Sequence, residues 1–211
     1  MVNGPDGCLY LVDMYRGIIQ EGNWVREGSY LRKVVQQYSL DKVAGHGRVW
    51  RLVHKDFQPG PQPRMLEETP AQWVAHLSHP NGWWRDTAQK LLVLRQDRSV
   101  VPALRSMVSS SKDIRSRMHA LWTLEGLGAA DAVTVRAAMK DGAAEVRTAA
   151  IRVSETLYKA GDVTFADDLA GLSKDGDARV VMQAVLTAKL LGTPQAKELL
   201  QACAFGKIGT P

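Results

Sequence analysis

The chain has 211 residues, a formal net charge of +5, 45% hydrophobic residues and 23% charged residues, an ordinary composition for a globular protein. No apolar run approaches the roughly 18 residues that a membrane span needs, and Cys8 and Cys203 belong to no Cys-x-x-Cys pattern, which excludes a disulfide framework and a zinc knuckle. The basic residues are spread evenly, with nine Lys/Arg against six Asp/Glu in residues 1–64, and this disfavours nucleic-acid binding.

The first 57 residues have a mixed pattern. A Pro-Asp-Gly turn leads into an apolar, β-rich run, which predicts a strand over Cys8–Tyr15. Apolar residues at helical spacing predict a helix over Tyr30–Tyr38, and alternation predicts a second strand over Gly47–His54. Two strands alone are marginal in water. The exposed strand edge here predicts either self-association or packing of this segment onto the first of the helical repeats described below.

A proline-rich connector, "FQPGPQP" over residues 57–63, follows this mixed segment. Beyond it the apolar period becomes helical and stays helical. We therefore divide the chain into a segment over residues 1–57, a linker over residues 58–69 and a helical array over residues 70–211.

The helical part repeats itself. Four arginines stand 32, 30 and 32 residues apart, each followed three positions later by a mostly small residue: Arg85, Arg117, Arg147 and Arg179. Four positions before them come Asn81, Asp113, Ala143 and Asp175, and Asn and Asp side chains are good helix N-caps. In the third repeat the cap candidate falls earlier, at Asp141.

Each cap opens a long apolar-periodic segment that follows a shorter one. The short segments are Pro70–Ser78, Val100–Val108, Ala132–Met139 and Thr164–Leu172, and the long ones are Trp83–Leu94, Ile114–Leu127, Glu145–Ala160 and Ala178–Leu191. A last helix is predicted near Gln195–Ala204. A single hairpin cannot bury its own apolar stripe, so stacked hairpins would share one core. The predicted core residues are Leu91, Leu92, Leu121, Leu124, Ile151, Val153, Leu157, Val185 and Leu186.

The repeat pattern resembles the HEAT-repeat family over residues 70–192. The resemblance rests on "DIRSR" and "DGDAR", on the variant "NGWWR", and on the small residue that follows; "AAEVR" lacks the acidic cap. It implies a mainly α fold, an α-solenoid of HEAT-like helical hairpins with a short N-terminal β segment. HEAT arrays usually present a surface to protein partners and rarely hold a catalytic site.

A second resemblance covers residues 3–160. The blocks "NGPDGCLYLVDMYRGIIQ", "YLRKVVQQYSLDKVAGHGRVWRLV", "SHPNGWWRDTAQKLLVLR" and "HALWTLEGLG" resemble, in this order, large bacterial membrane-bound dehydrogenases similar to sugar dehydrogenases that use pyrroloquinoline quinone. It implies a β-propeller followed by a HEAT-like array, often with a c-type cytochrome module, in the periplasm. Residues 1–57 would then be the C-terminal remnant of the propeller, with the missing propeller domain or another protein as partner.

The resemblance places candidate cofactor-binding residues at the end of the first strand: Asp13, Tyr15, Arg16 and Gln20. An arginine there can pair with a quinone carboxylate. His46, in a glycine-flanked loop, is a candidate general base. The alternative is structural, with Asp13 and Arg16 making turn contacts. The chain itself lacks a complete quinone pocket and a Cys-x-x-Cys-His haem site, so no cofactor is expected in it.

Other reactive residue types favour structural roles. His76 and His79 share a helix face, but no third metal ligand accompanies them, and no metal site is predicted. Cys8 and Cys203 are expected to be buried. Trp83, Trp84 and Trp122 would form either an aromatic contact patch or packing between repeats, with Trp24 and Trp50 as counterparts.

Three functional hypotheses remain. The first is a non-catalytic HEAT-repeat scaffold from the C-terminal part of a quinoprotein dehydrogenase. The second is a sugar or alcohol dehydrogenase whose propeller is only partly present. The third is a HEAT-type nucleic-acid-binding protein, which would need its basic residues concentrated on a concave face.

Overall fold

The computed structural model describes residues 1–211 except 20–24, 59, 61 and 205–211. The chain forms two compact units, Met1–Pro63 and Arg64–Pro211, and each is described by itself.

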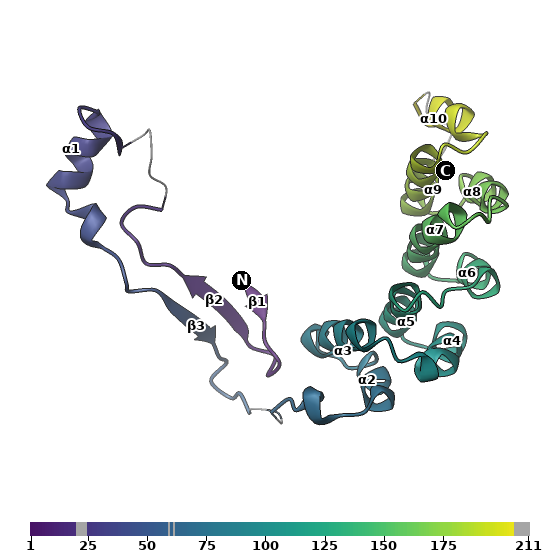
Figure 1. The fold of residues 1–211 in the computed structure, drawn as a ribbon, viewed down its shortest axis with the longest axis horizontal. Coiled ribbons are helices and arrows are strands. Elements are labelled where there is room, and N and C mark those ends of the chain that lie inside the picture. The colour runs from purple at the N-terminus through teal and green to yellow at the C-terminus, as the bar shows by residue number, and fades with distance from the viewer. Residues whose placement is uncertain (20–24, 59, 61, 205–211) are drawn as a thin grey trace. The chain divides into compact units, whose positions relative to one another are not determined.

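The first unit contains a three-stranded antiparallel sheet in the order β1-β2-β3 (Figure 1). Its strands are β1 (Val2–Asn3), β2 (Leu9–Asp13) and β3 (Arg48–Leu52). Strand β1 was not predicted; a turn joins it to β2, where Asp6 accepts hydrogen bonds from the Cys8 amide and the Tyr10 hydroxyl. Helix α1 (Tyr30–Gln37) agrees with its predicted span and is capped by Ser29.

Both faces of this sheet expose apolar side chains. Leu9 pairs with Leu52 and Val12 with Val49, and directly paired residues share a face. On one face Val12 and Val49 are 72% and 63% exposed, and on the other Trp50 and Leu52 are 51% and 53% exposed. A sheet with two uncovered apolar faces gains little from burial, so within this unit the strands are held mainly by their ladder.

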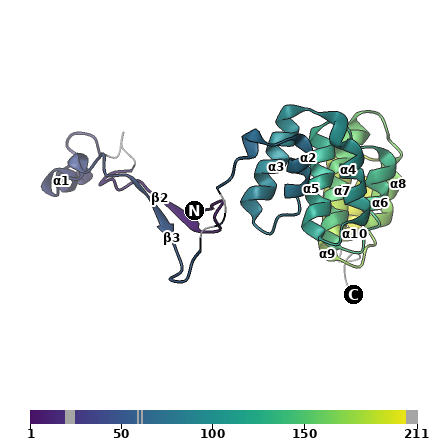
Figure 2. The ribbon, with the colours of Figure 1, turned by 90° about the horizontal axis from the view of Figure 1, so that it is seen from below.

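The second unit is an α-solenoid of helical hairpins in two layers (Figures 1 and 2). Each hairpin gives its first helix to one layer and its second to the other, and consecutive second helices pack side by side. The first layer holds α2 (Pro70–His76), α4 (Val101–Ser110), α6 (Ala132–Ala138) and α8 (Phe165–Leu172). The second holds α3 (Gly82–Arg95), α5 (Ile114–Gly126), α7 (Ala144–Lys159) and α9 (Ala178–Leu191), and α10 (Ala196–Ala204) packs on α9.

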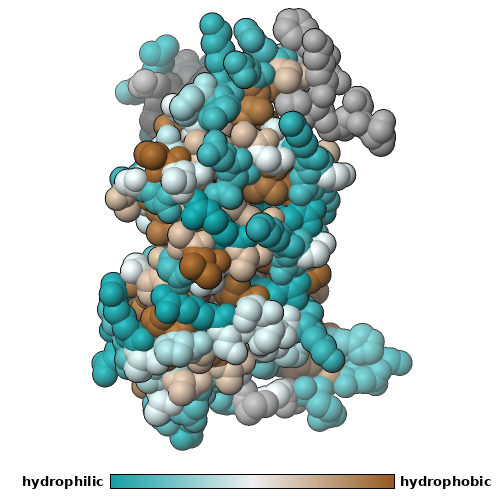
Figure 3. Space-filling view, turned by 90° about the vertical axis from the view of Figure 1, so that its right-hand side faces the viewer, coloured by the Kyte–Doolittle hydropathy of each residue, from teal (hydrophilic) through white to brown (hydrophobic). Residues whose placement is uncertain are grey.

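The layer of α3, α5, α7 and α9 lies on the inner side of the curve of this unit, and we call it the inner layer (Figure 1). The other helices form the outer layer. Figure 3 shows the side that carries α4, α6 and α8, where hydrophilic side chains surround separate hydrophobic ones.

The core of the helical unit lies between the two layers. Of the predicted core residues, Leu92, Leu121, Leu124, Ile151, Val153 and Val185 are buried, and Leu91 and Leu157 are half-buried. The prediction for Leu186 was wrong, because its side chain is 52% exposed on α9. Cys8 is buried as predicted.

Two of the four inner helices, α3 and α5, begin at the predicted caps. Asn81 accepts a hydrogen bond from the Trp83 amide, and Asp113 accepts one from the Arg115 amide. Helix α7 begins after Ala143, whose own amide donates to Asp141 at 2.7 Å. The cap of α9 is Asp177, which corrects the prediction of Asp175.

The small residues that let inner helices approach follow these true caps. Seven residues after the caps come Ala88, Ala120, Ala150 and Ala184, all fully buried. The sequence alignment placed Met182 in this series, and that assignment was wrong by two positions.

Candidate interaction surface

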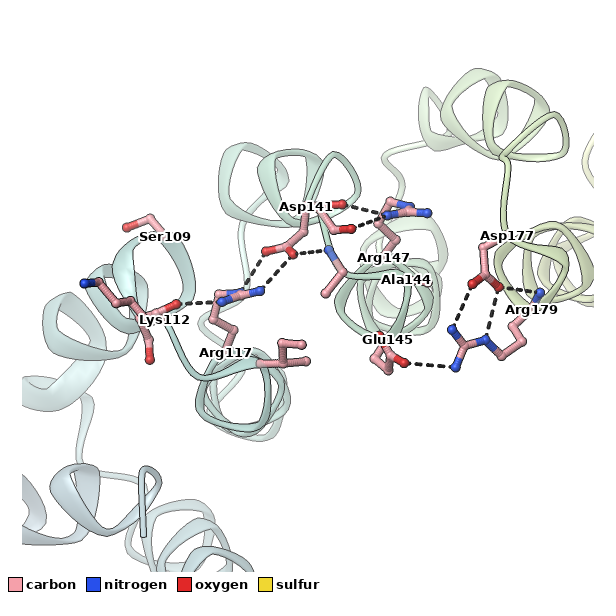
Figure 4. Close-up of a pocket in the computed structure, with 13 residues that line it drawn as sticks. Ser109, Lys112, Arg117, Asp141, Ala144, Glu145, Arg147, Asp177 and Arg179 are labelled. Carbon is pink, nitrogen blue, oxygen red and sulfur yellow. Dashed lines mark hydrogen bonds and ion pairs between the residues drawn. The ribbon is translucent and has the colours of Figure 1, made fainter. Parts of the chain in front are cut away.

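The N-terminal ends of α5, α7 and α9 border an open hollow of about 800 Å³ (Figure 4). Its walls are the turns between outer and inner helices, and its charged lining residues are Lys112, Arg117, Asp141, Glu145, Arg147, Asp177 and Arg179. Four of these are cations and three are anions, so the hollow is a candidate polar site. Its capacity to bind a ligand depends on which of these charged side chains already bind one another.

Three of the aligned arginines hold the turn that precedes their own helix. Each is the fourth residue of an inner helix, and its Nη1 donates to the carbonyl oxygen six residues earlier. The distances are 2.6 Å from Arg85 to His79, 2.6 Å from Arg117 to Ser111 and 2.8 Å from Arg147 to Asp141. These bonds satisfy carbonyl groups that the helix ends leave open.

Two of these arginines also bind the next repeat. Arg117 lies 3.0 Å (Nη2–Oδ1) and 2.9 Å (Nε–Oδ2) from Asp141, and Arg147 lies 2.7 Å and 2.8 Å from Asp175 in the same geometry. The hydrogen bonds from Arg147 lower the pKa of Asp175, and Asp175 raises the pKa of Arg147. Asp175 therefore accepts hydrogen bonds from Arg147 of the preceding repeat.

Arg179 does not belong to this series, which corrects the alignment made from the sequence. It is the second residue of α9, where its Nε and Nη2 donate to the cap Asp177 at 3.1 Å and 2.8 Å, and its Nη1 donates to Glu145 at 2.9 Å. Its structural counterpart is Arg115, the second residue of α5, whose Nε and Nη2 donate to the cap Asp113 in the same way. The bonds from Arg179 lower the pKa of Asp177 to about 2.

The first repeat boundary uses a histidine where the later ones use a carboxylate. Arg85 Nε donates to His119 Nε2 at 3.3 Å, so that nitrogen carries no proton and the Nδ1–H donates to Gln89 at 2.7 Å. Burial lowers the pKa of His119, which agrees with a neutral ring. The arginines and the histidine that cross the repeat boundaries are thus committed to structural contacts.

A second hollow, of about 270 Å³, lies on the inner layer between α5 and α7. Met118, Trp122, Thr148 and Ala149 form its largely apolar walls, and the charged residues around it are Glu145, Arg152 and Arg179. We call it the inner groove. Trp122 is half-buried and packs against the core, so the tryptophan contributes both to packing and to the surface.

Helix α9 continues the apolar surface of the inner layer. Met182, Leu186 and Leu190 follow one another at four-residue intervals and are 61%, 52% and 59% exposed. Residues four apart lie on one side of a helix, so these three form a stripe, which we call the α9 stripe. The stripe was not predicted from the sequence, because the spacing of Leu186 is that of a core residue.

In the first unit the structure brings together some of the candidate cofactor residues. Asp13 accepts from the Tyr15 amide at 3.0 Å and from Trp50 Nε1 at 3.1 Å, and the Trp50 bond is the main cause of its lowered pKa. The nearby cation is Arg48, 3.8 Å from Asp13, whereas Arg16 is exposed. Gln20 and Trp24 lie outside the described residues.

His46 lies near this cluster. Its ring meets the Tyr15 ring edge-on at 5.7 Å, and the Arg48 guanidinium lies 4.6 Å from the centre of the Tyr15 ring. Arg48 and Trp50 were not singled out as site residues; the alternation of β3 places them on the same face as Asp13 and was the available signal.

This cluster does not fit a quinone cofactor by itself. Pyrroloquinoline quinone carries carboxylates, and the Asp13 carboxylate at the centre of the cluster would repel them. Arg48 is already beside Asp13 and stacked on aromatic rings. A quinone site would need further cations beside this cluster.

The histidines on the first hairpin have structural partners. His76 Nε2 lies 2.8 Å from Glu68, and the His79 ring stacks on buried Trp84 with 5.1 Å between centres. Among the described residues, no cluster of three or more His, Cys, Asp or Glu side chains could hold a metal ion. Within the same residues, no helix is long and apolar enough to cross a membrane.

Comparisons with known protein families match two separate stretches of the chain. Residues 70–155 match the family model of HEAT repeats. Residues 1–56 match a domain of unknown function, DUF7133. A search of curated proteins found no match to the chain. The helical unit is therefore a scaffold of stacked helical repeats, and its residues 70–155 are similar to HEAT repeats.

Proposed function

We infer that the chain is a non-catalytic HEAT-type interaction module from the C-terminal part of a quinoprotein dehydrogenase. The observation that carries the inference is that charged and apolar side chains have different roles on the helical unit. The arginines, His119 and the carboxylates at the repeat boundaries bind one another and the turns, while large apolar side chains on the inner layer stay exposed. Such a surface binds by burying apolar area.

The sheet of the first unit supports the dehydrogenase origin. A sheet that is apolar on both faces is stable when other layers cover both, and the blades of a β-propeller are covered in this way by their neighbours. The exposed pairs Val12–Val49 and Leu9–Leu52 have this character. The resemblance of residues 3–160 to quinone-dependent dehydrogenases supports the same origin, and a parent of that kind would place the module in the periplasm.

Hydrogen exchange of the purified chain tests whether the sheet of the first unit needs other layers on its two faces to be stable. We expect peptides that contain β2 and β3 to exchange within seconds, because the side chains of these strands are exposed on both faces, while amides of α5 and α7 exchange orders of magnitude more slowly. Slow exchange in β2 and β3 of a monomeric chain would remove the argument for a propeller remnant.

An activity assay tests the non-catalytic part. The chain is incubated with pyrroloquinoline quinone and Ca²⁺, and dye reduction is followed with aldoses and alcohols over a range of concentrations. We expect no saturable turnover above that of the free quinone. Saturable turnover would show that the chain is an enzyme and would overturn the inference.

A further inference from the structure

The inner groove and the α9 stripe are parts of one apolar surface. Five residues after the caps of α5, α7 and α9 come Met118, Thr148 and Met182, and nine residues after them come Trp122, Arg152 and Leu186. Equivalent positions on packed parallel helices face the same side. The groove between α5 and α7 therefore continues onto the exposed stripe of α9.

Charge is concentrated on the same layer. The inner helices α3, α5, α7 and α9 carry ten Lys/Arg and four Asp/Glu, whereas the outer helices α2, α4, α6 and α8 carry two of each. Several inner arginines are neutralised at the N-terminal ends of the helices by Asp113, Asp141, Asp175 and Asp177. Arg85 at the N-terminal end of α3 donates to His119 and to the His79 carbonyl, and the other cations lie towards the C-terminal ends.

Five exposed cations lie in the C-terminal halves of the inner helices α3, α7 and α9: Lys90, Arg95, Arg152, Lys159 and Lys189. Two carboxylates accompany them there. Glu155 is buried and bonded to Thr187 and Arg152, and Glu125 is half-buried and accepts from Thr156. An apolar surface with a basic edge is complementary to a segment that has apolar anchors and an acidic edge.

We propose that the inner groove and the α9 stripe bind an acidic amphipathic segment of a partner protein. This proposal rests on the inferred interaction function and names the class of partner. The apolar side chains of the segment fill the groove beside Trp122 and cover Met182 and Leu186, and its carboxylates face the basic edge. Large apolar anchors in a pocket supply most of the binding energy, and the charges fix the orientation.

Nucleic acid is a less suitable occupant of this surface. Arg117, Arg147 and Arg179 are engaged by carboxylates, so a phosphate backbone could contact only the cations of the basic edge. Met182, Leu186 and Leu190 would also stay exposed beside a phosphate backbone. The apolar centre of the surface therefore favours a peptide.

The test uses the full chain and defined peptide probes. The first probe is an 18-residue, fluorescein-labelled helical peptide with leucines on one face and glutamates on the other; the second has lysine in place of each glutamate. Fluorescence anisotropy measures their affinities in low salt. We expect the acidic peptide to bind at least about 10-fold more tightly than the basic one.

Variants locate the binding surface. We expect Leu186→Asp to weaken the acidic peptide by at least about 10-fold, because a carboxylate replaces an apolar anchor and repels the probe. The matched control is Val133→Asp on the outer helix α6, where the side chain is 81% exposed, and it should leave the affinity unchanged. The double variant Lys159→Glu/Lys189→Glu tests the charge without touching the apolar surface and should weaken binding several-fold. Circular dichroism confirms that each variant is folded.

The outcomes separate this proposal from the inferred function. Absence of acidic-peptide binding, equal affinity of the two peptides, or an unchanged affinity in Leu186→Asp would overturn the assignment of this surface and leave the non-catalytic inference standing. Tighter binding of a 20-base-pair DNA, abolished by Lys159→Glu/Lys189→Glu, would assign the surface to nucleic acid instead. Saturable quinone-dependent turnover would overturn the inferred function, whatever the peptides do.

Discussion

Arg147 joins two repeats through Asp175. Its Nη2 lies 2.7 Å from Oδ1 and its Nε lies 2.8 Å from Oδ2, and its Nη1 holds the Asp141 carbonyl at 2.8 Å. The two side chains are only 16% and 11% exposed. One planar guanidinium thus fixes the turn before its own helix and the turn before the next, which is a geometry that lysine cannot reproduce.

Arg147→Met should lower the free energy of unfolding of the helical unit by about 2 kcal/mol, because it removes hydrogen bonds to a carbonyl and leaves a shielded carboxylate without its partner. Urea unfolding followed by circular dichroism at 222 nm measures the change. The control is Arg179→Met, whose ion pairs are exposed and whose side chain is 63% exposed, so the midpoint should stay the same within error. Equal losses of stability in the two variants would contradict the stabilising role of the Arg147–Asp175 contact between repeats.

Asp175 should make the stability sensitive to acid. Its pKa is lowered from 3.8 in the folded chain, so its contribution is present above the unfolded value and is lost as the pH falls through the folded value. The difference in unfolding free energy between the native chain and Asp175→Asn should therefore be constant above about pH 5 and shrink below about pH 4. Urea midpoints from pH 7 to pH 3 measure it. A difference that grows on acidification would refute the assignment.

His119 should also make the stability sensitive to acid, at a higher pH than Asp175 does. Burial lowers its pKa below 6.5, so the unfolded chain takes up the proton first, and stability is lost as the pH falls through 6.5 towards the folded value. Arg85 next to Nε2 disfavours the protonated ring further. The stability of the native chain relative to His119→Asn should fall between pH 7 and pH 5. A pKa above 6.5 in a proton NMR titration of this ring would rule out the explanation.

Gly126 tests the close approach of α3 and α5. A Cβ atom there would lie 2.5 Å from Cγ2 of Val93, so Gly126→Ala should destabilise the chain although alanine is the better helix former. Val93→Ala should relieve the clash in the double variant. Gly171 in α8 is the matched control, because a Cβ there meets nothing within 4 Å, and Gly171→Ala should stabilise the chain by about 0.5–1 kcal/mol. Thermal midpoints of the four variants decide the prediction.

Local patterns in the sequence determined most of the repeat architecture. Apolar periodicity placed the helices close to their observed bounds, and the Asn and Asp caps marked where α3 and α5 begin. Caps act through bonds to amides two or three residues away, and a helix has one period, so both signals are contained in a short stretch of chain. For the same reason the buried Ala88, Ala120 and Ala150 could be found without a structure.

Only the tertiary structure decided the register of the fourth repeat and the nature of the surface. Asp175 and Asp177 are equally good caps by sequence, and the choice depends on Arg147, which arrives from the preceding repeat and binds Asp175. Leu186 has the spacing of a core residue, yet no later element covers that side of α9 within the described residues. Charges that are even along the chain gather on the inner layer, because the chain gives every second helix to that layer.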